Sequence, residues 1–207
     1  MTNERKPRGP YRKSAQRREQ ILQAAYEAVD EHGERASLHD IAQRVGVTQP
    51  ALTYYFPTRD DLLLAVLERR DVLGKAFGRA VAERETIVDS VVAGTRFVTD
   101  HPGIAKLHVT LAAAATDPES PAHGYFADRY RALAAEVIQA VEEGQRAGVF
   151  RADQPAEHLA RAVVAVLEGL QMQWMHDPTV DMVGIAETFT RMLVPPAGAD
   201  GGEQREG

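Results

Sequence analysis

The sequence predicts an all-α protein with about nine helices. Apolar residues recur at a spacing near 3.6 along almost the whole chain, which is the spacing of one face of an α-helix. The alternating β-branched pattern of strands bounded by turns is missing. Clusters of Pro, Gly and Asp separate the apolar segments, as is typical of loops. The expected helices cover residues 15–32, 38–45, 49–56, 59–84, 86–100, 102–116, 121–147, 155–175 and 181–194.

Residues 37–56 carry the signals of two short helices joined by a tight turn. Ser37 and Asp40 have the spacing of a capping box at the start of the first helix. Gly46 can adopt the left-handed backbone that ends a helix, and Thr48 can cap the helix that follows. Two short helices joined in this way form a helix-turn-helix, whose second helix enters a groove of DNA. An ordinary helical hairpin has the same local pattern.

The second helix of this motif presents polar and aromatic side chains. Leu52 and Phe56 can form its core side, and no carboxylate lies between Gly46 and Thr58. Gln can form two hydrogen bonds with adenine, whereas Thr, Pro and aromatic edges suit thymine methyl groups or the sugar-phosphate backbone. Ordinary solvated surface is the alternative for each polar residue. The candidate DNA contacts are Gln49, Pro50, Thr53, Tyr54 and Tyr55, followed by Arg59 as a phosphate contact.

Basic charge is concentrated near this motif. The chain carries a net charge of −6, but residues 1–59 contain ten Lys or Arg against seven Asp or Glu, so the remainder carries −9. Residues 1–14 contain Pro, Gly and basic residues, which predicts a flexible basic arm that can neutralise phosphates or serve only as a solubilising tail. The basic residues next to the first helix are better placed for phosphate contact. These residues are Arg12, Lys13, Arg17 and Arg18.

The N-terminal part resembles the DNA-binding domain of TetR/AcrR-type transcriptional regulators. The resemblance rests on Ile21-Leu-Gln-Ala-Ala25, Ser37-x-x-Asp-Ile-Ala42, Val45-Gly-Val-Thr48 and Tyr54-Tyr-Phe-Pro-Thr-Arg-Asp-Asp-Leu-Leu63. It implies a three-helix DNA-binding domain over residues 15–75, with the helix-turn-helix at 37–56, and a helical effector-binding and dimerisation domain over 76–194. Residues 195–207 contain no large apolar side chain, which predicts a disordered tail.

The resemblance also implies which residues contact DNA. Thr53 stands where the family usually has Tyr, and Tyr55 stands where His is commoner, so the register of base contacts is open. The family's phosphate-binding lysine falls on Arg59, which keeps the positive charge. The positions expected to contact DNA are Arg17, Ser37, Thr48, Gln49, Pro50, Thr53, Tyr54, Tyr55 and Arg59.

The last two expected helices, 155–175 and 181–194, are apolar over more of their circumference than a surface helix needs. A four-helix interface between two copies would cover this surface, and a symmetric dimer would reach two half-sites about one DNA turn apart. Burial within one chain is the alternative, but the family dimerises through its last two helices. The interface residues predicted here are Val164, Met175, Ile185, Phe189 and Met192.

Aromatic, sulfur-containing and bulky residues with a few polar groups among them lie on four of the expected helices. This composition is typical of an apolar cavity that holds a small ligand, although many such residues only fill a core. Family regulators bind small, usually hydrophobic effectors in this domain and release DNA. The candidate ligand contacts are Arg96, Phe97, Leu107, His108, Leu111, Phe126, Tyr130, Met172, Trp174 and Met175.

The residue inventory argues against an enzyme. The chain has no Cys, no His-Glu-x-x-His and no Gly-x-Ser-x-Gly, so we expect neither a catalytic site nor a metal or cofactor. No apolar stretch is long enough to span a membrane and no signal-peptide core follows the basic start, which predicts a cytoplasmic protein.

Together these observations predict a homodimeric, ligand-responsive repressor that is released from a palindromic operator in double-stranded DNA by a small hydrophobic molecule. Two alternatives remain. One is a regulator or activator of the same fold that needs no ligand, and the other is a helical interaction protein that has lost DNA binding.

Overall fold

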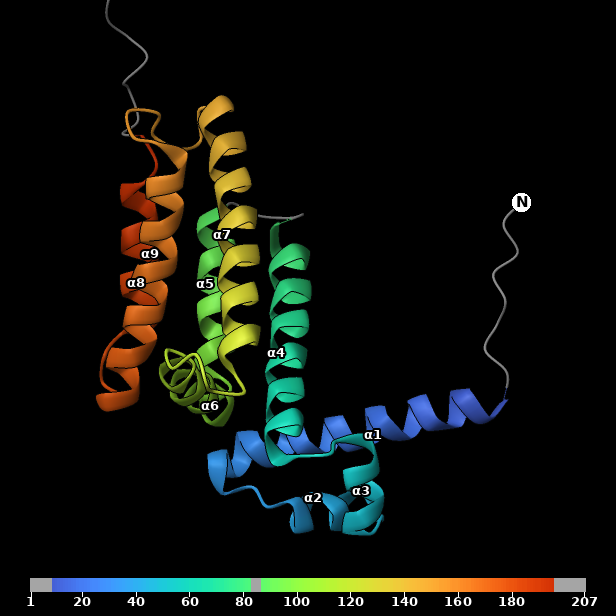
Figure 1. The fold of residues 1–207 in the computed structure, drawn as a ribbon. Coiled ribbons are helices and arrows are strands. Elements are labelled where there is room, and N and C mark those ends of the chain that lie inside the picture. Colours follow the sequence, from blue (N-terminus) through green and yellow to red (C-terminus); the bar gives the residue numbers. More distant parts are fainter. Residues whose placement is uncertain (1–8, 83–86, 196–207) are drawn as a thin grey trace, which may run out of the picture. The chain divides into compact units, whose positions relative to one another are not determined.

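The computed structural model describes residues 9–82 and 87–195, and every regular element in these two ranges is helical (Figure 1). The predicted all-α fold class is confirmed. The elements are α1 (Gly9–His32), the short 3-10 helix η1 (Gly33–Arg35), α2 (Leu38–Val45), α3 (Gln49–Tyr55), α4 (Arg59–Ala82), α5 (Ile87–Thr99), α6 (Pro102–Ala114), α7 (His123–Arg146), α8 (Ala156–His176) and α9 (Met182–Met192).

Helix α1 begins six residues before the expected start at Ala15, so residues 9–14 of the expected flexible arm are helical. This start is compatible with Pro10, the second residue of the helix. A proline in the first helical turn costs no hydrogen bond, because the N–H groups there have no intrahelical partner. Residues 1–8 of the expected arm and 196–207 of the expected tail lie outside the described residues.

The chain divides into two compact units. Unit 1 consists of Met1–Lys75 and Val98–His123, and unit 2 consists of Ala76–Phe97 and Gly124–Gly207. The first division between the units falls after Lys75, and the second segment of unit 1 contains α6. The domain bounds expected from the sequence, which place α6 in the effector domain, stay a prediction.

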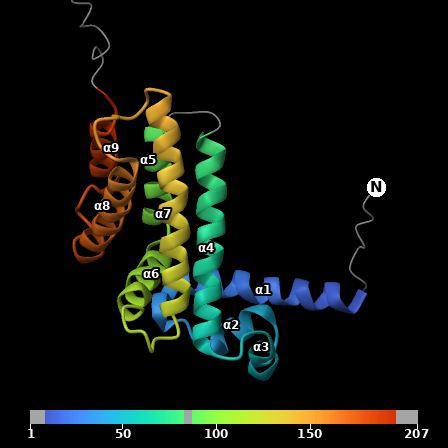
Figure 2. The ribbon, with the colours of Figure 1, turned by 45° about the horizontal axis from the view of Figure 1, so that its top comes forward.

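Unit 1 has a continuous apolar core beneath the helix-turn-helix. Figures 1 and 2 both show α2 and α3 beside α1, and α2 contacts each of these helices. The core contains side chains from α1, α2, α3, α4 and α6 that are at most 2 % exposed. These side chains are Ile21, Val29, Ile41, Leu52, Phe56, Leu62, Val66, Leu67, Ile104 and Leu107.

Helix α6 joins unit 1 through a close contact between its first turn and α1. A Cβ added at Gly103 would lie 2.3 Å from the carbonyl oxygens of both Val29 and Asp30, so only glycine fits there. The ring of His101, just before α6, packs edge-on against buried Tyr26 at 5.9 Å. Burial raises the pKa of the Asp30 carboxyl, although the charge of His101 and hydrogen bonds from the first amides of α6 oppose this shift.

A buried polar contact also ties α6 to α4 within unit 1. Arg70 Nη1 on α4 lies 3.3 Å from His108 Nδ1 on α6, and both residues are at most 9 % exposed. An imidazole nitrogen facing a guanidinium must act as the acceptor. His108 is one of the residues that the sequence suggested as a ligand contact.

Unit 2 has its own core at one end of α7, α8 and α9. The buried cluster consists of Val141, Phe150, Leu159, Ala160 and Leu193. Helix α8 runs alongside α9, as both ribbon views show. In the described ranges, no helix has both the length and the apolar character required to cross a bilayer.

Candidate nucleic-acid interface

The first helix of the helix-turn-helix is capped as its sequence predicts. The hydroxyl oxygen of Ser37 accepts a hydrogen bond from the amide of Asp40 at 3.1 Å and donates to the Asp40 carboxylate at 2.6 Å. Gly46 ends α2 in the left-handed region with φ of +69°, and the amide of Val47 closes the turn on Ala42 O at 3.0 Å. These bonds fix the direction in which the chain leaves α2.

Helix α3 starts at once after this turn. The Thr48 hydroxyl accepts from the amide of Ala51 at 3.3 Å, and Pro50 lies in the first turn of the helix. Tyr54 is 79 % exposed, and its ring packs edge-on against that of Tyr55 at 5.1 Å. An exposed aromatic side chain held by a neighbouring ring is available for a partner of the protein.

A second reciprocal cap begins α4 and sets the position of Arg59. The Thr58 hydroxyl accepts from the amide of Asp61 at 3.1 Å, and the Asp61 carboxylate accepts from the amide of Thr58 at 2.9 Å. Arg59 is the first residue of α4 and is exposed. The cap therefore places an exposed guanidinium only a few residues after α3.

Helix α1 holds the helix-turn-helix and α4 through three arginines. The guanidinium of Arg18 lies 4.7 Å from the centre of the Phe56 ring, a cation–π contact at the end of α3. Arg69 on α4 bonds to Glu19 and Gln23 of α1. The third arginine, Arg44 of α2, contacts the end of α1.

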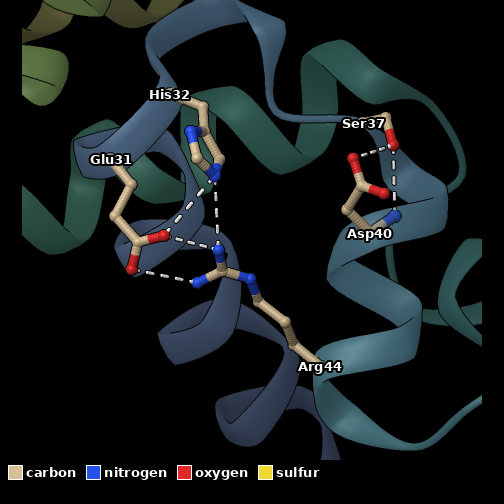
Figure 3. A network of polar contacts seen from close by, with 5 residues as sticks. All are labelled: Glu31, His32, Ser37, Asp40 and Arg44. Atoms are coloured by element: carbon tan, nitrogen blue, oxygen red, sulfur yellow. Dashed lines mark hydrogen bonds and ion pairs between the residues drawn. The ribbon is translucent and has the colours of Figure 1, made fainter.

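Figure 3 shows the guanidinium of Arg44 beside Glu31 and His32 of α1. Its nitrogens donate to the two carboxylate oxygens of Glu31 at 3.1 and 2.5 Å, and Nη2 lies 3.4 Å from His32 Nε2. The Arg44 hydrogen bonds lower the pKa of the Glu31 carboxyl. Sequence analysis missed this pair, because no local signal connects residues 13 positions apart on different helices.

The structure brings most of the expected DNA contacts to α3 and its flanks. Arg17, Thr48, Gln49, Pro50, Tyr54 and Arg59 are exposed, whereas Ser37, Thr53 and Tyr55 are half-buried. Ser37 uses its hydroxyl in the cap of α2. The segment from Thr48 to Arg59 contains no carboxylate, and its exposed side chains include amide, aromatic and guanidinium groups.

The expected ligand residues are divided between the two units. Leu107 and His108 are buried in α6 of unit 1, where Leu111 is half-buried. The other seven belong to unit 2, where Phe126 is buried and its ring lies 6.1 Å from that of Tyr130. Arg96 and Met172 are exposed there, and Phe97, Trp174 and Met175 are half-buried.

Two family models match the sequence. Residues 21–66 match the model described as "Bacterial regulatory proteins, tetR family", and residues 94–195 match the model described as "BetI-type transcriptional repressor, C-terminal". The chain belongs to the TetR family of bacterial regulatory proteins. TetR-family members are DNA-binding transcriptional regulators and not enzymes, and this chain is such a regulator. No curated protein was found to match the sequence.

Solved structures share the TetR fold at low sequence identity. A regulator from Saccharomonospora viridis in complex with choline is 23 % identical, with a TM-score of 0.69 and coverage of 86 % of this chain and 95 % of that one. A TetR-family regulator from a Rhodococcus species is 22 % identical, with a TM-score of 0.69 and coverage of 87 and 100 %. A TetR regulator from Haloarcula marismortui is 23 % identical, with a TM-score of 0.70 and coverage of 87 and 97 %. At this identity the likeness establishes the fold.

Proposed function

We propose that this TetR-family protein is a homodimeric repressor that binds a palindromic operator and is released from it by a small, hydrophobic ligand. The observation that carries the proposal is the exposed surface of α3, which three side-chain caps hold between α2 and α4. A helix held in this way can enter the major groove without first being ordered, so its contacts with bases need not offset the cost of folding it.

Exposed apolar residues on α8 and α9 support the dimer. Ile185 is 42 % and Met192 67 % exposed, and Val164 and Met175 are half-buried. Phe189, also expected at the interface, packs partly against the core cluster of unit 2. Large apolar side chains that a monomer leaves exposed on two adjacent helices are typical of an interface between copies.

The dimer can be tested by placing a charge on this surface. Ile185→Glu combined with Met192→Glu should convert dimers to monomers in sedimentation velocity and reduce operator affinity. Val149→Glu is the matched control, because Val149 is 43 % exposed but lies outside both helices. If the double variant remains dimeric, the proposed interface is wrong.

The related structure that contains choline supports a small-molecule ligand, and the aromatic residues of unit 2 support a hydrophobic one. The operator should first be selected from genomic DNA fragments, which would give its sequence and half-site spacing together. A labelled operator should then be titrated with protein in the presence of choline and of a panel of apolar small molecules. Release of the operator by one of these compounds would support a ligand-responsive repressor.

A regulator that needs no ligand is the second candidate. Two hollows on the described surface are open to solvent. One lies along α7 and α8 between Tyr130 and Arg161, and the other lies near Arg151 and Met192. Operator affinity that no compound changes would support this candidate. Weak binding to every duplex, without steep salt dependence, would instead indicate a helical interaction protein that no longer binds DNA.

A further inference from the structure

The hydroxyl group of Thr53 is directed toward the backbone of its own helix. Its Oγ1 donates a hydrogen bond to the carbonyl oxygen of Pro50 at 3.0 Å. A threonine in a helix satisfies its hydroxyl in this way when no other partner is present. While its proton is used by the helix, the hydroxyl does not donate to a base, and the methyl group is the other substituent that Cβ carries.

Thr53 lies at the edge of the exposed side of α3. Leu52 is fully buried, whereas Tyr54 is 79 % exposed, and Thr53 between them is half-buried. Gln49 is exposed and lies four positions before Thr53, so the two side chains are neighbours on one face of the helix. Their Cβ atoms should be about 5–6 Å apart, a distance that corresponds to one or two base-pair steps of about 3.4 Å.

This arrangement determines which base each side chain suits. The amide of Gln49 can donate to and accept from the edge of adenine, while an apolar methyl group suits the 5-methyl group of thymine. A tyrosine, which the family usually has at this position, would present a ring and a phenol there. This chain offers a short apolar group instead.

We propose that the Thr53 methyl group contacts the 5-methyl group of a thymine in each operator half-site, within two base pairs of an adenine bound by Gln49. Thr53 is then a specificity-determining residue that acts through its methyl group. The inference rests on the proposed function, because it requires that α3 binds in the major groove.

The test removes the methyl group from each side of the contact separately. Thymines of the selected operator are replaced by deoxyuracil one position at a time, symmetrically in both half-sites. Withdrawal of one methyl group from an apolar contact should weaken binding about fourfold, and therefore about 15-fold when both half-sites change. One thymine position in each half-site should show this effect with the wild-type protein.

Two variants then separate the methyl group of Thr53 from its hydroxyl. Thr53→Val keeps the methyl group and should bind as the wild type does, with the same preference for thymine over deoxyuracil. Thr53→Ser keeps the hydroxyl and should lose that preference, binding both operators about as weakly as the wild type binds the deoxyuracil operator. Thr116→Ser is the matched control, because the Thr116 hydroxyl also donates to a carbonyl three residues earlier, at 2.8 Å.

Each outcome decides the inference. If Thr53→Ser still prefers thymine, or if Thr53→Val loses binding while its circular dichroism spectrum is unchanged, the methyl contact is wrong and the proposed function stands. If the wild-type protein binds a selected operator but no deoxyuracil substitution weakens it, the inference fails alone. If the wild-type protein binds no duplex at low salt, the proposed function fails and this inference fails with it.

Discussion

Replacement of Gly103 by alanine should destabilise unit 1, because α6 contacts α1 through backbone at this residue. The added Cβ would lie 2.3 Å from two carbonyl oxygens, those of Val29 and Asp30. Backbone atoms inside α1 cannot rotate away as a side chain can, so α6 must shift outward. Overpacking of this kind costs up to about 3 kcal/mol, and the better helix propensity of alanine offsets about 1 kcal/mol. We expect a net loss of about 2 kcal/mol.

The assay is unfolding in urea followed by far-ultraviolet circular dichroism. With a slope of about 2 kcal/mol per molar urea, a loss of about 2 kcal/mol lowers the midpoint by about 1 M. Gly124→Ala is the control, because Gly124 is also the second residue of a helix but has nothing within 4 Å of its added Cβ. That variant should be as stable as the wild type or up to about 1 kcal/mol more stable. A Gly103→Ala protein with an unchanged midpoint would refute the close packing of α6 on α1.

Three further predictions concern the same unit. Gly46→Ala places a side chain at φ of +69° without a clash, so it should cost only the strain of the left-handed backbone, about 1–2 kcal/mol, measured as a lower urea midpoint. Arg59→Gln should weaken binding to all duplexes alike and reduce the slope of log affinity against log salt by about 1, measured by titration at several salt concentrations; an unchanged slope would mean that Arg59 contacts no phosphate. The pKa of Asp30 is raised in the folded protein, mainly by burial, so the wild type should gain stability as pH falls through that pKa. Asp30→Asn should lack this gain. If the urea midpoints of the wild type and of Asp30→Asn change in the same way between pH 7 and pH 4, the pKa of Asp30 is not raised by folding.

The elements of the helix-turn-helix could be predicted from sequence because their signals are local. Ser37, Thr48 and Thr58 each bond to a residue three positions further on, so the pattern and the bond lie in the same short segment. The left-handed turn is equally local, because only the conformation of Gly46 decides it. Such short-range preferences determine the ends of helices even before tertiary contacts form.

The contacts that hold these helices in place could not be predicted in the same way. Arg44 bonds to Glu31 across 13 positions, and Arg70 lies against His108 across 38. The sequence spacing of such pairs carries no periodic signal, since it depends on how the helices cross. For this reason the sequence could not reveal that His108 is buried against the guanidinium of Arg70. The role of His108 as a ligand contact stays a prediction.

The division of the chain bears on how an effector could act. The chain passes between the two units three times, within α4, within α5 and at the start of α7. The connection within α4 and the connection within α5, which leads to α6, involve helices that contact the DNA-binding helices directly. Helix α4 begins with the cap beside Arg59, and α6 begins at the contact of Gly103 with α1. A ligand that displaced α4 or α6 would have to break the buried contacts of that helix. Such a ligand must therefore bind the displaced state more tightly than the undisplaced state, by at least the free energy of those contacts. The Gly103→Ala variant therefore also measures this coupling, because it shifts α6 without any ligand and should lower operator affinity if α6 transmits the signal.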